Sequence, residues 1–336
     1  MRIITVEEHA ISPALNKALA KYGKAGAPYQ ALAHAKGYPY DADPVLFADL
    51  GEKRIADMDA AGIDMQVLSC PVQAQQLPPD IAVAAVRDAN DELAAAISLH
   101  PDRFAGFCSL PWSAPEAAAR ELERAKSLGY CGALIGGRAI PEGGFLDDPR
   151  FTPVLEAAAA LRMPIYVHPA APMDTVQQAY YAGLDDLVSA RLSLFGWGWH
   201  HEAGIQVLRM ILAGVFDRFP ALQVISGHWG EMVPFFLSRL DQALPQAVTK
   251  LSTSITETFR THVYVTPSGI FDIPQLKFCM DVLGVERILH SVDFPFIGNE
   301  GAKPFLDQAP ISEEARAKIA YRNAEALLQN RGTHDD

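Results

Sequence analysis

Apolar, strand-type runs and helix-type segments alternate along most of the 336-residue chain, and this alternation restricts the possible folds more than any other feature. Strands that are separated by helices pair in parallel, because each helix carries the chain back to the same edge of the sheet. Eight strand-type runs lie at residues 3–6, 65–69, 104–109, 130–135, 165–167, 223–226, 263–265 and 287–291. Segments with apolar residues at helical spacing lie between them, at 52–61, 79–100, 114–127, 151–161, 202–212, 234–243 and 274–283, and a last helix begins at Ser312.

Eight alternating units predict an α/β fold of the (β/α)8 TIM-barrel type. A doubly wound open sheet is the alternative, but no Gly-x-Gly-x-x-Gly signature follows the first strand. Residues 10–50 form a long link between the first two strands, and we expect them to be an inserted cap beside the site. No linker or repeat divides the chain, so residues 1–336 are expected to form a single domain.

Composition excludes several classes of partner. The chain has 28 Lys and Arg against 40 Asp and Glu, a net charge of −12, which argues against binding to nucleic acid or to anionic membranes. No apolar stretch approaches the roughly 20 residues that span a bilayer. None of the four cysteines forms a Cys-x-x-Cys pair, which favours reduced core thiols and a cytoplasmic protein.

Four of the strand-type runs end near a residue that can ligate a metal ion. Glu7 and His9 follow the first run, His168 the fifth, His228 the sixth and Asp293 lies at the end of the eighth. Glu7 and His9 point the same way because side chains alternate along a strand. In a barrel, the C-terminal ends of all strands lie at one face, so these five side chains are expected to converge there.

Two carboxylates and two imidazoles, from Glu7, His9, His168 and Asp293, suit one divalent ion, either Zn²⁺ or Mn²⁺. No cysteine joins the set, so the pattern is not that of a closed structural zinc site. Open positions would remain for water and substrate, as catalytic metal ions require.

Three motifs are the most specific: Glu7-Glu8-His9, Gly227-His228-Trp229-Gly230-Glu231 and Ser291-Val292-Asp293-Phe294-Pro295-Phe296. With other motifs along nearly the whole chain, they resemble the amidohydrolase superfamily. Within it they are similar to the branch that contains the aminocarboxymuconate semialdehyde, γ-resorcylate and 2,3-dihydroxybenzoate decarboxylases.

The chain departs from the commoner pattern in four places. The opening is Glu7-x-His9 rather than His-x-His, and the fourth strand ends in Gly136-Gly137. His290 and Ile297-Gly298 are not typical neighbours of the last Asp, and residues 195–201 are an aromatic run.

The resemblance implies metal-dependent, non-oxidative decarboxylation of a small hydroxybenzoate-like or related ring carboxylic acid. Asp293 is the candidate general acid, His228 the candidate to share its proton, and Glu231 the candidate to orient His228. Arg54 and Arg239 are candidates to bind the substrate anion. In the resembling enzymes an arginine that matches Arg239 reaches the site of a neighbouring subunit, which implies a homodimer or homotetramer.

Two other classes of function stay open. The same metal site could activate water for hydrolysis of a lactone, ester or amide, with Asp293 as the base and His228 polarising the carbonyl. A binding protein without catalysis on the same scaffold is the third class. The aromatic run at 195–201 is expected either to line the pocket or to pack at a subunit interface.

Overall fold

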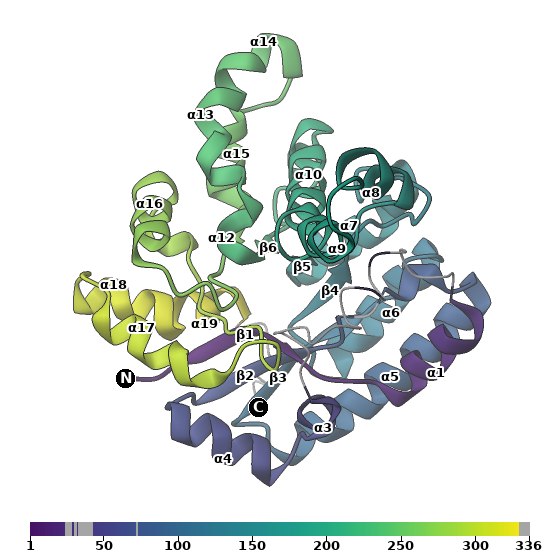
Figure 1. Ribbon diagram of the computed structural model, residues 1–336, viewed down its shortest axis with the longest axis vertical. Coiled ribbons are helices and arrows are strands. Elements are labelled where there is room, and N and C mark those ends of the chain that lie inside the picture. The colour runs from purple at the N-terminus through teal and green to yellow at the C-terminus, as the bar shows by residue number, and fades with distance from the viewer. Residues whose placement is uncertain (24–28, 30–31, 33–42, 72, 329–336) are drawn as a thin grey trace.

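Seven parallel strands, in sequence order, form a curled sheet that is consistent with a TIM-type barrel (Figure 1). The structure is a computed structural model, and it describes residues 1–23, 29, 32, 43–71 and 73–328. Every strand residue except Tyr264 is buried, as expected where helices cover a parallel sheet. The strands are β1 (Ile4–His9), β2 (Met65–Ser69), β3 (Phe104–Ser109), β4 (Gly132–Gly136), β5 (Ile165–His168), β6 (Val224–Ser226) and β7 (Val263–Val265).

The predicted eighth strand, at 287–291, is not a regular strand. A short 3₁₀ turn precedes it, and only isolated bridges join it to the sheet. The segment still hydrogen-bonds to both neighbours: the amide of Leu289 donates to Val265 of β7, and the carbonyl of His290 accepts from Val6 of β1. Beyond the segment, Asp293 has a φ of +69°, which turns the chain out of the extended conformation.

The helices predicted between the strands agree with those of the structure to within a few residues. The first of them, α4 (Glu52–Ala61), ends at the left-handed Gly62. Ser312 caps the predicted last helix, which runs as α18 (Glu313–Ala317), a π-helical stretch and α19 (Asn323–Leu328). The other predicted helices are α5 (Pro79–Leu99), α6 (Pro115–Ser127), α7 (Thr152–Leu161), α10 (Gly198–Leu212), α13 (Val233–Ala243) and α16 (Ile273–Leu283).

Further helices lie in the connections that were read as loops. Two of them, α8 (Asp174–Tyr180) and α9 (Asp186–Ser193), stand between β5 and α10. Another, α15 (Ile255–His262), projects from the body of the fold together with the predicted α13, to which α14 (Gln246–Thr249) joins it (Figure 1). The remaining ones are α11 (Val215–Arg218), α12 (Gly227–Glu231) and α17 (Ala302–Gln308).

The link at 10–50 contains α1 (Pro13–Tyr22), which lies along α5, and α3 (Pro44–Ala48) (Figure 1). Much of the expected cap, at 24–28, 30–31 and 33–42, lies outside the described residues. The main apolar core fills the space between the strands and the surrounding helices. Within the described part of the chain, none of the helices has the length and apolar character needed to cross a membrane.

Candidate metal centre and active site

The structure brings together the four side chains that were predicted to hold a metal ion. Glu7 and His9 lie in β1, His168 ends β5, and Asp293 lies in the segment that follows β7. One ligand atom from each lies within 4.8 Å of the others. His9 Nε2 is 2.9 Å from Asp293 Oδ1, and His168 Nε2 is 3.7 Å from Glu7 Oε1. Parallel strands explain this convergence, since their C-terminal ends meet at one face.

Both imidazoles are held at the nitrogen that faces away from the cluster. Nδ1 of His168 lies 2.8 Å from the carbonyl of Pro169, and Nδ1 of His9 lies 3.3 Å from Ser69 Oγ. The two rings meet edge to face, with centroids 5.0 Å apart. In each ring Nε2 is therefore directed at the cluster, in the arrangement that metal-binding histidines usually have.

Glu7 is a buried carboxylate that lacks a protein partner at one oxygen. Ser268 Oγ donates a hydrogen bond to Oε2, but within the described residues Oε1 accepts none. Burial raises the pKa of Glu7 to about 7. A buried acceptor without a donor is costly, and a cation beside Oε1 would remove that cost. The donor set, two carboxylates and two imidazoles without a thiol, therefore fits a divalent ion such as Mn²⁺ or Zn²⁺.

Glu8 points away from the cluster and fixes the loop that carries Asp293. Its two carboxylate oxygens accept hydrogen bonds from the amides of Val292 and Phe294, each at 3.0 Å, on either side of Asp293. Burial raises the pKa of Glu8 to about 8, although the two amide donors and the charge of Arg54 act in the opposite direction. The sequence showed Glu8 only as the residue facing the other way, and its supporting contacts were missed.

Arg54 does not line the pocket. Its side chain is 2% exposed, donates to the carbonyl of His9 at 2.9 Å and to Gln66 at 2.7 Å, and lies over the ring of Phe294. Burial lowers its pKa to about 10. These contacts place Arg54 behind the cluster, next to the backbone of His9.

His228 and Glu231 lie on a left-handed turn. Residues 228–232 all have positive φ, between 45° and 81°, so α12 coils in the sense opposite to an ordinary helix. Each non-glycine residue in this conformation costs roughly 1–2 kcal/mol. Two contacts hold the turn: the His228 amide donates to Ser268 Oγ at 2.9 Å, and the Trp229 amide donates to Thr266 at 2.7 Å.

This turn separates Glu231 from the helix that carries Arg239. The chain leaves the left-handed turn at Met232, and α13 begins at Val233. Glu231 and Arg239 therefore lie on separate elements, and their separation in sequence does not give the position of Arg239 relative to the pocket. Arg239 is exposed on α13.

Glu231 orients His228 through a hydrogen bond of 2.8 Å between its Oε1 and Nδ1 of the ring. Burial disfavours the charged imidazole, but Glu231, Glu7 and Asp293 outweigh it and raise the pKa of His228 to about 9. His228 was expected to share the proton of Asp293, but within the described residues no hydrogen bond joins the two side chains. Asp293 instead pairs with His9.

His200 is a site residue to which the sequence analysis gave no role. It lies 31 residues before Glu231 and binds the second oxygen of that carboxylate, with Nδ1 2.7 Å from Oε2. Its neighbours Phe195 and Trp199 line the pocket with it, so these three residues of the aromatic run at 195–201 form part of the pocket wall. The only sequence signal was a histidine within an unusual aromatic run.

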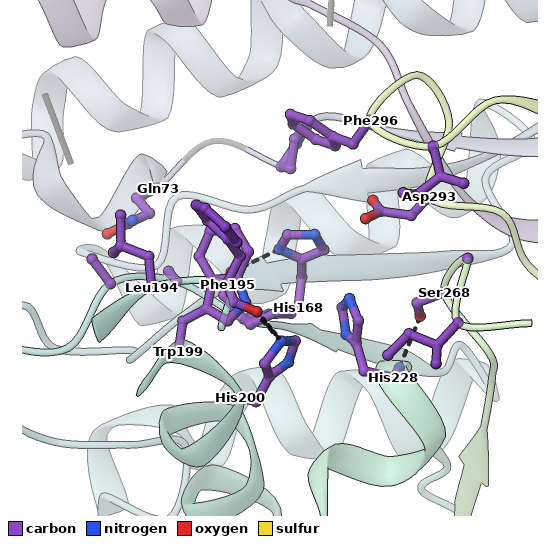
Figure 2. Close-up of a pocket in the computed structure, with 17 residues that line it drawn as sticks. Gln73, His168, Leu194, Phe195, Trp199, His200, His228, Ser268, Asp293 and Phe296 are labelled. Atoms are coloured by element: carbon purple, nitrogen blue, oxygen red, sulfur yellow. Dashed lines mark hydrogen bonds between the residues drawn. The ribbon is translucent and has the colours of Figure 1, made fainter. Parts of the chain in front are cut away.

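A cavity of about 350 Å³ opens beside the cluster, and His168, His228 and Asp293 point into it (Figure 2). Aromatic and aliphatic side chains form most of its wall, and no Lys or Arg of the described residues lines it. Phe296 lies against His9, with ring centroids 5.6 Å apart. The other lining residues are Pro71, Gln73, Pro169, Ala170, Ala171, Leu194, Phe195, Trp199, His200, Ser268, Gly269, Ile270 and Ile297.

Comparison with known proteins identifies the family. Residues 47–329 match the model of the amidohydrolase family, so the chain belongs to that family. The chain is also 34% identical over 336 residues to the decarboxylase orsB of Emericella nidulans, covering 97% of each chain.

Two solved structures extend the comparison. The 5-carboxyvanillate decarboxylase LigW of Sphingomonas paucimobilis has a TM-score of 0.87 and 31% identity, over 98% of this chain and 99% of that one. A dihydroxybenzoic acid decarboxylase of Polaromonas sp. JS666, with bound manganese and the inhibitor 2-nitroresorcinol, has a TM-score of 0.85 and 30% identity, over 98% of each chain.

Proposed function

We propose that this protein is a metal-dependent, non-oxidative decarboxylase of a hydroxybenzoate-like or related small ring carboxylic acid. The observation that carries the proposal is the convergence of Glu7, His9, His168 and Asp293 beside an apolar cavity that also holds His228. Relatives named as decarboxylases, two of them of ring carboxylic acids, match the chain over nearly its full length and support the proposal.

Glu7, His9, His168 and Asp293 would hold one divalent ion, Mn²⁺ or Zn²⁺. When bound, the ion would supply a positive charge that anchors the substrate carboxylate and stabilises negative charge on its oxygens. The manganese bound to the dihydroxybenzoic acid decarboxylase favours Mn²⁺.

Decarboxylation requires a proton at the ring carbon that carries the carboxylate. The carbon forms a new C–H bond, the bond to the carboxylate carbon then breaks, and its electron pair restores the aromatic ring as CO₂ leaves. Asp293 faces the cavity and would deliver this proton. His228 has Nδ1 fixed by Glu231, which leaves Nε2 to exchange protons inside the cavity. In the same proposal Arg54 supports the backbone of His9 rather than contacting substrate.

Arg239 would bind substrate from a neighbouring subunit. It is exposed on α13, which projects from the body of the fold beside α15 (Figure 1). The same region carries an exposed aromatic cluster of Phe235, Phe236 and Phe278, with exposures of 71%, 50% and 36%. Exposed apolar clusters of this kind mark protein interfaces. A homodimer or homotetramer that buries this cluster would bring Arg239 to a partner's site.

Two further parts of the proposal concern the whole chain. Residues 1–336 would be one domain in which 10–50 cap the cavity. Phe47 of α3 packs on Phe296, with ring centroids 5.2 Å apart, and Tyr29 and Leu32 pack against the cluster around Leu194, which supports the cap. A cytoplasmic location is supported by the four cysteines, which are all buried and none of which forms a disulfide.

The test is product analysis with the metal-loaded protein. Hydroxybenzoic acids are supplied in water enriched in oxygen-18, and the released CO₂ and the ring product are measured. Decarboxylation gives CO₂ and a ring product that has lost one carboxyl group. A lactone, ester or amide that is cleaved with oxygen-18 in a new carboxylate, without CO₂ from any ring acid, would establish the hydrolase instead.

A further inference from the structure

A single buried carboxylate is shared by two histidines at the wall of the cavity. Glu231 Oε1 lies 2.8 Å from Nδ1 of His228, and Oε2 lies 2.7 Å from Nδ1 of His200. The Glu231 side chain has no exposed surface, and the two imidazole rings meet at an angle of 64°, with centroids 4.5 Å apart. Each oxygen of the carboxylate therefore has one imidazole partner.

His200 is itself held in place on its far side. The Trp199 indole donates to Nε2 of the ring at 3.1 Å, and the carbonyl of Phe195 lies 2.9 Å from the same nitrogen. Figure 2 shows Phe195, Trp199 and His200 along one wall of the cavity, with His228 beside them. An unprotonated Nε2 accepts from the indole, whereas a protonated Nε2 donates to the carbonyl of Phe195, so Nε2 has one of these two partners in either state. In the tautomer that accepts from the indole, the ring proton is on Nδ1 and is donated to Glu231.

We propose that His200 is a positioning residue that acts on His228 through Glu231, an inference that rests on the proposed decarboxylase function. A carboxylate with one imidazole partner can rotate about its last side-chain bond, and the direction of its hydrogen bond to His228 then changes. With His200 bound to Oε2, that rotation is blocked. Nε2 of His228 is consequently held toward the cavity and the metal ligands.

The neighbouring wall gives this arrangement a second consequence. Phe195 and Trp199, which hold His200, also line the cavity, so they contact a bound ring. Packing of the ring against them is thereby linked, through His200 and Glu231, to the residue proposed to exchange the proton. His200, His228 and Glu231 also offer three atoms close enough to ligate a metal ion. The hydrogen bonds at 2.7 and 2.8 Å favour the positioning role over a second metal site.

The kinetic test compares two substitutions at one position. His200→Leu removes the donor, whereas His200→Asn keeps an N–H near the position of Nδ1. We expect kcat to fall about tenfold or more in H200L, as is typical when the partner that orients a functional histidine is lost. KM should change little, and H200N should recover most of kcat. The neighbouring, exposed His201 provides the control, and H201N should match the wild type. A rise in KM with unchanged kcat, or equal losses in H200L and H200N, would overturn the proposal.

A double-mutant cycle with Glu231→Gln tests whether His200 acts through Glu231. If it does, the H200L/E231Q protein should be no slower than E231Q alone, because the path to His228 is already broken. Losses that multiply would show that His200 acts independently of Glu231. Metal content should be one equivalent per chain in both the wild type and H200L. Two equivalents that fall to one in H200L would assign a second metal site instead.

A measurement that does not depend on catalytic activity separates this inference from the proposed function. In ¹⁵N-histidine spectra, the wild type should show two hydrogen-bonded Nδ1–H protons, from His200 and His228. H200L should lose one signal and shift the other, whereas H201N should change neither. Should no hydroxybenzoate be decarboxylated, the proposed function fails while these spectra still decide the contact. An unshifted His228 signal in H200L would overturn the positioning role.

Discussion

Asp293 contacts His9 through its side chain, and its backbone neighbours are bound by Glu8. It is predicted both to ligate the metal and to deliver a proton, and the structure places its Oδ1 2.9 Å from His9 Nε2 while the side chain faces the cavity. Its backbone is held on both sides by the carboxylate of Glu8. Asp293 and the residue that positions its backbone are therefore adjacent in space, although 285 residues separate Glu8 from Asp293 in sequence.

Replacing Asp293 with Asn tests the proton role. The amide keeps an oxygen for the metal but cannot give up a carboxylic proton, so kcat should fall about 10²–10⁴-fold, the usual value of general acid catalysis. Stopped-flow CO₂ assays and metal analysis measure the two effects separately. Asp272→Asn, at the exposed start of α16, is the control. A D293N protein with full metal and normal kcat would exclude Asp293 as the donor.

Replacing Glu8 with Gln tests the support of the Asp293 loop. The amide group of Gln would face one of the two backbone N–H groups that Glu8 now accepts. An unsatisfied buried group of this kind costs about 1–3 kcal/mol. We expect urea unfolding to show a loss of this size and metal analysis to show weaker binding. Glu92→Gln, at an exposed position, should leave both values unchanged.

At the scale of elements, the left-handed turn of α12 decides where His228 and Glu231 lie. The hydrophobic pattern predicted a strand at 223–226 and a helix at 234–243, and both are present as β6 and α13. The turn between them was not predicted, because short-range patterns carry little information on a run of positive φ angles. Strain of this kind persists only where surrounding contacts fix it, and it is often found at functional sites.

Gly230→Ala tests this element. Gly230 has a φ of +81°, and an added Cβ would lie 2.9 Å from Pro234 and from Val265. We expect a loss of about 1–3 kcal/mol in unfolding free energy, together with reduced kcat as His228 moves. Gly214→Ala is the matched control, with a φ of +67° and no atom nearer than 3.8 Å to the new Cβ. Thermal unfolding and CO₂ release are measured for both. If G230A and G214A lose equal stability and G230A keeps a normal kcat, the turn does not position His228.

At the scale of the whole molecule, the proposed dimer makes a prediction about mixed subunits. His228→Ala and Arg239→Ala should each be inactive alone. After dissociation and random re-association, half of the dimers are hybrids with one intact site, so about a quarter of wild-type activity should return if Arg239 acts across the interface. Mass spectrometry verifies the hybrids. Verified hybrids without activity would mean that Arg239 does not complete a partner's site.

His290 links the stability of the fold to pH. The ring is fully buried beside Phe271 and Phe305, and burial lowers its pKa to about 4. The unfolded chain takes up this proton near pH 6.5, whereas the folded chain does so only near pH 4. As the pH is lowered from 6.5 to 4, the unfolding free energy should decrease by about 3 kcal/mol in total, since one pKa unit is worth about 1.4 kcal/mol. His290→Phe should remove this part of the pH dependence in urea unfolding, and an unchanged slope would contradict the assignment.

Local patterns were enough to predict seven of the strands, the helices between them and the convergence of Glu7, His9, His168 and Asp293. Strand and helix periodicity depends on neighbouring residues, and parallel strands bring their ends to one face wherever the chain folds this way. The comparisons confirm the family that these motifs indicated.

Tertiary structure alone decided the rest. The segment predicted as the eighth strand is joined to its neighbours only by isolated bridges, and Asp293 beyond it turns the chain with a positive φ. His200 reached Glu231, and Arg54 lay behind His9 rather than in the cavity. These contacts join residues that are 31 and 45 positions apart. Which residues make these contacts depends on how the helices pack around the strands, and the local periodicity of the sequence does not predict that packing.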